Sequence, residues 1–235
     1  MPATPTDSQI FTALRTFLLG VLPPGVDVLQ AQANRVPEPA GTDFVLMTPL
    51  RRERLETNVD SYADVLFTAS IAGTVLTVTG VNFGTIQIGA TVYGTGLANG
   101  TTTIVGQLSG TGGVGTYSVS LSQISGSQFM AAGLANLMQP TEITIQLDVH
   151  GPNSANNVQV ISTTFRDDYA VQQFATYGVD VTPFYADDPK QIPFINESQQ
   201  YENRWVVEAC LQANITVSVS AQFASIVSVT LVELL

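Results

Sequence analysis

The chain has 235 residues, of which 45% are hydrophobic and only 11% are charged. This balance excludes intrinsic disorder, because disordered chains are rich in charge and poor in apolar residues. A formal net charge of −11, from 19 acidic and 8 basic side chains, also disfavours attractive binding to nucleic acid.

The amino-terminal region lacks the marks of a membrane span or a secretion signal. Residues 10–22 are apolar, but Arg15 interrupts them and they are too short to cross a bilayer core. Asp7 stands where a signal peptide would carry Lys or Arg. A single cysteine, Cys210, fits a reducing compartment. We therefore expect the chain to be made in the cytoplasm of the producing cell.

The first predicted element is a helix that begins after Thr6. Thr6 and Gln9 have the spacing of a capping box, and apolar residues then follow on one helical face until Pro23. Residues 26–30 and 43–48 are predicted strands. The basic run formed by Arg51, Arg52 and Arg54 is expected to begin a third strand that leads into Val59.

The middle of the chain has a different composition. Residues 65–141 contain no Asp, Glu, Lys or Arg, and they hold 14 of the 19 glycines. Short runs of β-branched residues between glycines predict short strands, and Thr and Ser hydroxyls allow such a surface to be solvated without charge. We expect an inserted all-β module at residues 67–136. The predicted strands are residues 74–79, 86–88, 90–93, 101–105 and 116–119.

After the module, residues 141–150 alternate between apolar and polar side chains, which predicts a strand with one buried face. Asn153 is expected to cap a second helix that ends near residues 177–178, and a proline-bearing loop follows at residues 183–193. Residues 204–219 keep one apolar parity throughout, which predicts one very long strand. Residues 226–233 are expected to return antiparallel beside it.

The predicted fold class is α+β: a mostly antiparallel sheet flanked by two helices, with an inserted small all-β domain. Residues 1–66 and 137–235 form the discontinuous core domain, and residues 67–136 form the module.

The sequence assigns no catalytic, cofactor-binding or metal-binding residue. It contains no HExxH, CxxC, Walker or GxSxG pattern. The only histidine, His150, is interpreted as a polar residue at a strand end, and Cys210 as a half-buried structural thiol.

Three further patterns have a structural interpretation beside a functional one. Glycines 110, 112 and 115 match GxGxxG, but a strand follows them where a dinucleotide site needs a helix, so we expect a hairpin loop. The adjacent Asp187 and Asp188 are more typical of a solvated turn than of a cation site. The arginines at 51, 52 and 54 fit either an acidic partner or an edge strand that uses charge to prevent aggregation. The sequons at Asn99, Asn196 and Asn214 have no meaning without secretion.

Three segments of the two flanks carry a family resemblance. Residues 188–235 (DPKQIPFINESQQYENRWVVEACLQANITVSVSAQFASIVSVTLVELL), with the opening helix and residues 46–62 (LMTPLRRERLETNVDSY), resemble the neck or tail-terminator proteins of tailed bacteriophages. The middle module resembles a Gly/Thr-rich β module that recurs as an insertion in unrelated phage structural proteins.

The resemblance implies a structural virion protein with no enzymatic activity and no cofactor. It implies a ring of identical copies, a homohexamer, that ends the tail tube and joins it to the head connector. Its implied partners are itself, tail tube and sheath proteins, the head-tail connector or adaptor, and genomic DNA passing through the lumen without sequence-specific binding. No membrane is involved. An acidic protein is compatible with that passage of DNA.

Two other functions stay open at this point. The chain is alternatively another tail or head-tail adaptor component with the same core. It is alternatively a surface- or glycan-binding protein that acts through the inserted module, with Tyr93 or Tyr117 offering a stacking surface.

Overall fold

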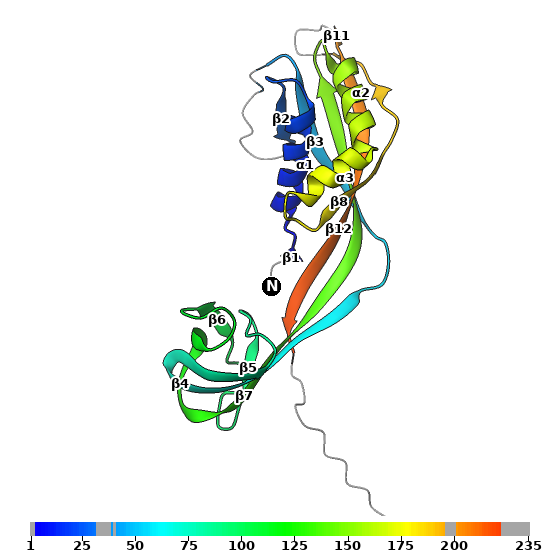
Figure 1. Ribbon diagram of the computed structural model, residues 1–235. Coiled ribbons are helices and arrows are strands. Elements are labelled where there is room, and N and C mark those ends of the chain that lie inside the picture. Colours follow the sequence, from blue (N-terminus) through cyan, green and yellow to red (C-terminus); the bar gives the residue numbers. More distant parts are fainter. Residues whose placement is uncertain (1–2, 32–38, 40, 196–200, 222–235) are drawn as a thin grey trace, which may run out of the picture. The chain divides into compact units, whose positions relative to one another are not determined.

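The computed structural model describes residues 3–31, 39, 41–195 and 201–221 (Figure 1). The elements in chain order are β1 (Ala3–Thr4), α1 (Asp7–Val21), β2 (Asp27–Gln30), β3 (Phe44–Arg54), β4 (Val59–Phe83), β5 (Thr91–Tyr93), β6 (Ile104–Gln107), β7 (Gly115–His150), α2 (Ser154–Phe165), α3 (Asp168–Ala175), β8 (Val181–Ala186), β9 (Lys190–Gln191), β10 (Phe194–Ile195), β11 (Tyr201–Glu202) and β12 (Arg204–Ser220).

The chain divides into two compact units. Among the described residues, the helical unit comprises residues 3–58 and 139–216, and the strand unit comprises Val59–Met138 and residues 217–221. Most strands belong to one mixed sheet with the order β1-β12-β7-β3-β2, in which β2 and β3 are parallel. The fold is therefore α+β as predicted, with three helices in place of the expected two.

In the helical unit, the three helices pack on one face of the sheet (Figure 1). α1 begins with the predicted capping box, in which the Thr6 hydroxyl accepts from the Gln9 backbone and the Gln9 side chain accepts from the Thr6 backbone. The core combines the apolar side of α1 with alternate residues of β7 and β12. The core positions from β7 are Ile143, Ile145, Leu147 and Val149, and those from β12 are Val207, Ala209, Leu211 and Ala213.

The second predicted helix is two helices. α2 ends at Phe165, and α3 starts afresh because Asp167 caps it, its carboxylate accepting from the Tyr169 backbone at 2.9 Å. Asn153 stands at the N-cap of α2, as predicted, but its side chain makes no cap hydrogen bond. Its side-chain amide instead donates to Asp43 at 2.9 Å.

Two strand predictions also need correction. The three arginines do not begin a new strand, because β3 itself continues to Arg54 along β7. The expected loop at residues 183–193 contains β8 and β9, and Pro183 lies within β8. β8 lies at the edge of the sheet among the described strands, which is where a strand tolerates a proline. The predicted strand at residues 226–233 lies outside the described residues.

In the strand unit, the predicted strands at residues 74–79 and 116–119 are parts of two long strands, β4 and β7, and those predicted at residues 90–93 and 101–105 overlap the short strands β5 and β6. β4 pairs with β7 antiparallel from Val59↔Met138 to Val78↔Gly115, with two bulges. β5 and β6 add to β7, and the predicted strand at residues 86–88 does not form. The core of this unit lies between these strands and includes Phe67, Leu76, Val92 and Ile104.

Side-chain amides take the place of charges in holding the loops of the strand unit. The Gln128 side chain accepts from the Thr95 backbone N–H at 3.1 Å and donates to its carbonyl at 2.9 Å. Gln123 accepts from the Ala98 backbone N–H at 3.2 Å. These bonds let a stretch without ionic side chains fix its loops.

The two hydrophobic cores have no residue in common. We therefore expect the helical unit to fold when residues 60–137 are replaced by Asn-Gly. Val59 and Met138 face each other in the ladder, so a two-residue turn joins them without a change of register. Thermal unfolding followed by circular dichroism should remain cooperative. A product that aggregates or lacks near-ultraviolet signal from Trp205 would contradict this expectation.

Candidate functional site

The face of the sheet away from the helices carries a row of polar side chains that is nearly as buried as the apolar core. The row on β7 is Glu142, Thr144, Gln146, Asp148 and His150. Four of these residues are at most 8% exposed, so the strand has two buried faces where the sequence predicted one. Buried polar groups need partners, and neighbouring strands supply them.

Asp148 is at the centre of the first group of contacts. The Arg204 Nε donates to its Oδ1 at 2.9 Å and a second guanidinium nitrogen donates to the same oxygen. Gln146 donates to both carboxylate oxygens, at 2.9 and 2.8 Å. This buried ion pair joins β7 to β12 and is far less solvated than the exposed pair of Arg166 and Asp188.

The second group of contacts crosses four strands. Arg51 on β3 donates from Nε to the Thr144 hydroxyl at 3.2 Å, and Thr144 lies 3.7 Å from the Cys210 sulfur on β12. Cys210 is paired in register with Tyr185 on β8. Tyr185 donates to Glu142 at 3.2 Å. The predicted structural role of Cys210 agrees with its 2% exposure, although it is fully rather than half buried.

These neighbours change the acidity of Tyr185. Its pKa is raised, first by hydrogen bonding to Cys210 and by the charge of the Cys210 sulfur in its thiolate form, and then by burial and the Glu142 carboxylate. The phenol therefore stays protonated across the ordinary pH range and serves as a donor rather than as a base.

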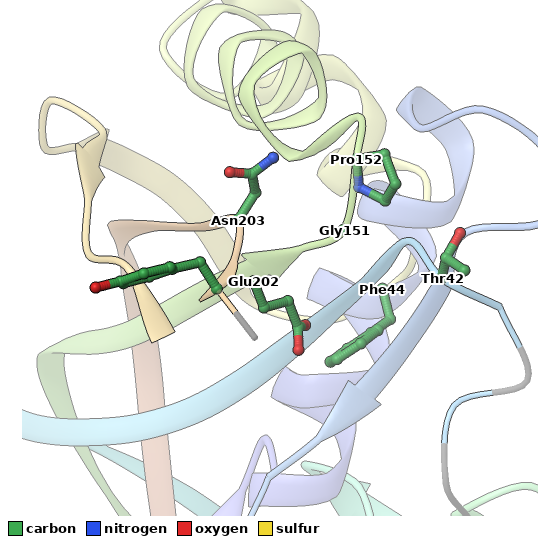
Figure 2. A pocket seen from close by; sticks show the side chains of 7 residues that line it. Thr42, Phe44, Gly151, Pro152, Glu202 and Asn203 are labelled. Carbon is green, nitrogen blue, oxygen red and sulfur yellow. The ribbon is translucent and has the colours of Figure 1, made fainter. Parts of the chain in front are cut away.

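A pocket of about 410 Å³ lies at the end of this polar face (Figure 2). Its walls are the start of β3, the turn after β7 and the strand β11 with the residue after it. Figure 2 shows the Phe44 and Glu202 side chains directed to the same side, whereas Asn203 points the opposite way. The lining residues are Thr42, Phe44, Gly151, Pro152, Tyr201, Glu202 and Asn203.

His150 anchors this pocket. Its Nδ1 lies 3.0 Å from Glu202 Oε1, and its ring stacks on Phe44 with centroids 4.5 Å apart and planes 7° apart. The Gly151 N–H donates to the Asn203 carbonyl at 3.1 Å. The prediction of a polar residue at a strand end was right, and the stacked ring and the carboxylate explain how it is held.

The turn after β7 requires glycine. Gly151 has a φ of +103°, and a Cβ there would lie 2.3 Å from the Thr42 carbonyl oxygen. This close approach also lets the Asn153 backbone N–H donate to Asp43 Oδ1 at 2.9 Å, which places a carboxylate at the start of α2.

The other residues that the sequence singled out are scattered. Asp188 pairs with Arg166, and the described residues form no group of three or more His, Cys, Asp or Glu side chains fit to hold a metal ion. Glycines 110, 112 and 115 lie in and beside the loop between β6 and β7, as predicted. Tyr117 is 1% exposed and donates to the Gly113 carbonyl, so it offers no stacking surface. Burial also raises the pKa of Tyr117.

Sequence reasoning missed the partners of the polar row, which are Phe44, Tyr185, Glu202 and Arg204. Alternation placed Glu142 and Asp148 on one face of β7, but it gave no sign of which strand faces them. The carboxylates of Asp148 and Glu202 are engaged by neighbouring side chains, so the arrangement holds the neighbouring segments together.

Residues 112–233, more than half of the chain, match the family model described as phage neck terminator protein. This chain belongs to the phage neck terminator family. The protein is thus a structural component of the phage neck, located in the virion, and it interacts with other tail and head proteins. No curated protein matches it. None of the helices in the described part is long and apolar enough to cross a membrane.

The family match covers one side of the candidate site. His150, Gly151, Glu202 and Arg204 lie within the matched residues, whereas Phe44 and all of β3 precede them. The pocket of this neck terminator protein therefore combines matched residues with a segment that the family model does not reach.

Asp148→Ala should destabilise the neck terminator protein by roughly 2–4 kcal/mol, because it leaves the half-buried Arg204 without its carboxylate. The matched control is Asp188→Ala, which removes an exposed ion pair and should cost at most about 1 kcal/mol. Urea unfolding of both variants measures the difference. Equal losses in the free energy of unfolding would mean that the buried ion pair stabilises the fold no more than the exposed pair does.

Gly151→Ala should cost roughly 2 kcal/mol or more, because the new methyl group meets backbone atoms and φ is positive. Gly178→Ala is the control, since Gly178 has a φ of +67° with no atom within 4 Å of the added Cβ. The control should lose only about 1 kcal/mol from backbone conformation. Differential scanning calorimetry compares the two, and a Gly151 variant no less stable than the control would refute the close approach.

Proposed function

We propose that copies of this protein form a ring, a homohexamer, that ends the tail tube and joins it to the head connector. The observation that carries this proposal is the match of residues 112–233 to the phage neck terminator family. The matched residues include β7, which runs through both units, and most of the surface that carries the polar row.

Several features of the chain support a role in assembly. In the described part, the side chains of the polar row contact side chains of neighbouring strands, which makes the helical unit a firm body for repeated contacts. The formal net charge of −11 would let genomic DNA pass through a lumen without adhering to it or being read by sequence. The role is structural and needs no cofactor.

We also propose that residues 67–136 are an inserted all-β module in a core domain made of residues 1–66 and 137–235. The separate hydrophobic cores support this division, as does the boundary of the strand unit at Val59 and Met138. In this proposal the helical unit carries the ring, and the module is an addition to it. Synthesis takes place in the host cytoplasm, before assembly into the virion.

The test is to locate the protein in intact particles and to weigh it in solution. Cryo-electron microscopy should find a ring of six copies at the head-proximal end of the tail tube. Mass photometry, with and without purified tail tubes, should detect the same oligomer. Monomers alone under both conditions would overturn the proposal, and a location elsewhere in the tail or at the head side would favour an adaptor role.

A further inference from the structure

The helical unit has two sheet edges that no described strand covers. β2 pairs with β3 only as far as Met47, so β3 from Thr48 to Arg54 is paired on one side only among the described residues. On the opposite side of the sheet, β8 is paired with β12 and with no other described strand. Leu50 is 45% exposed and Phe184 is 52% exposed, so both edges also present apolar side chains.

The two edges lie at the same level of the sheet. The contacts from Arg51 through Thr144 and Cys210 to Tyr185 form one row across β3, β7, β12 and β8. Thr141 lies three residues before Thr144 on β7, and it pairs with Arg54 on β3. Ala213 lies three residues after Cys210 on β12, and it pairs with Val181 on β8. Arg54 therefore stands level with the start of β8, where Asp180 precedes Val181.

The directions of the strands fit an edge-to-edge contact. The contacts of Thr144 with Cys210 and of Asp148 with Arg204 show that β7 and β12 are antiparallel. β3 is antiparallel to β7 and β8 is antiparallel to β12, so β3 and β8 are antiparallel to each other. Sheets of two copies placed side by side would thus meet as an antiparallel pair, the commoner kind of strand neighbour.

The charges on the two edges are complementary. Three of the eight basic residues of the chain stand on β3, at positions 51, 52 and 54. Asp180 directly precedes β8, and Asp187 and Asp188 directly follow it. The internal ion pairs of Arg51 and Arg52 are exposed, and such pairs hold a side chain only weakly.

We propose that the β3 edge of one copy docks on the β8 edge of a second copy, with Arg54 against Asp180. This inference rests on the proposed ring and names the surface that closes it. A contact between two different edges is head-to-tail, and repetition of such a contact gives a ring when the rotation closes. Pro49 on β3 and Pro183 on β8 each lack a backbone N–H donor, so the main-chain hydrogen bonds between the two docked edges would be incomplete. The charged side chains would then set the register of one edge against the other.

Charge reversal tests the contact in the full-length protein. Arg54→Glu and Asp180→Arg should each raise the concentration at which the ring dissociates at least tenfold, because each places like charges together. The double variant restores a pair of opposite charges, so the concentration at which its ring dissociates should lie within about threefold of the wild-type value. Asp60→Arg is the control, since it makes the same change of charge as Asp180→Arg at an exposed residue of β4, away from both edges, and should have no effect. Mass photometry over a dilution series gives the midpoints, and circular dichroism reports whether each variant is folded.

A cross-linking variant tests the geometry independently of stability. Arg54→Cys with Asp180→Cys should give a ladder of disulfide-linked oligomers after mild oxidation. Within one copy the two positions are three strand spacings apart, roughly 14 Å, which is too far for a disulfide. Cys210 is buried and is present in the control that lacks the two new cysteines.

The outcomes separate this inference from the proposed function. A wild-type ring whose dissociation is unchanged by both reversals, and whose cysteine variant forms no ladder, would overturn the edge contact and leave the ring. A wild type that is monomeric in solution and on tail tubes would overturn both. Weakening by the single variants, rescue by the double variant and a ladder support the contact.

Discussion

The alternation of side chains along β7 and β12 is the constraint on which the helical unit depends. Because successive residues of a strand point to opposite faces, one parity lies under the three helices and the other lies in the polar row. Both faces of β7 are buried, so its register cannot shift by one residue. Such a shift would place Asp148 among the helices and Leu147 beside Arg204. Register, core and site are therefore fixed together.

Much of the helical unit could be predicted, because local chemistry determines it. The Thr6–Gln9 capping box and the parity of residues 204–219 each depend on neighbours in sequence, and both predictions were confirmed. The division into α2 and α3 could not be predicted from apolar spacing, since the break depends on the single cap at Asp167. In the strand unit, glycines suggested turns where the structure has bulged continuous strands, because long-range pairing outweighs local preference.

The candidate site could not be predicted from the sequence, for a different reason. Glu202 and Phe44 stand far apart in the chain and reach His150 because the end of β7 pairs with β3 and because Gly151 is hydrogen-bonded to Asn203, the residue after Glu202. The types of these residues gave no indication that they lie close together in the fold. Only Gly151, next to the lone histidine, marked the turn where the close approach occurs. Family membership rests on the match of residues 112–233 to the family model.

The uncharged stretch at residues 65–141 has a consequence for how contacts respond to solvent. With no side chain there that gains or loses a proton near neutrality, its surface keeps the same electrical character in acid, in neutral buffer and in brine. An association made through this uncharged stretch would thus persist where one made through the arginines of β3 fades. Sensitivity to ionic strength consequently reports which half of the molecule a neighbour touches.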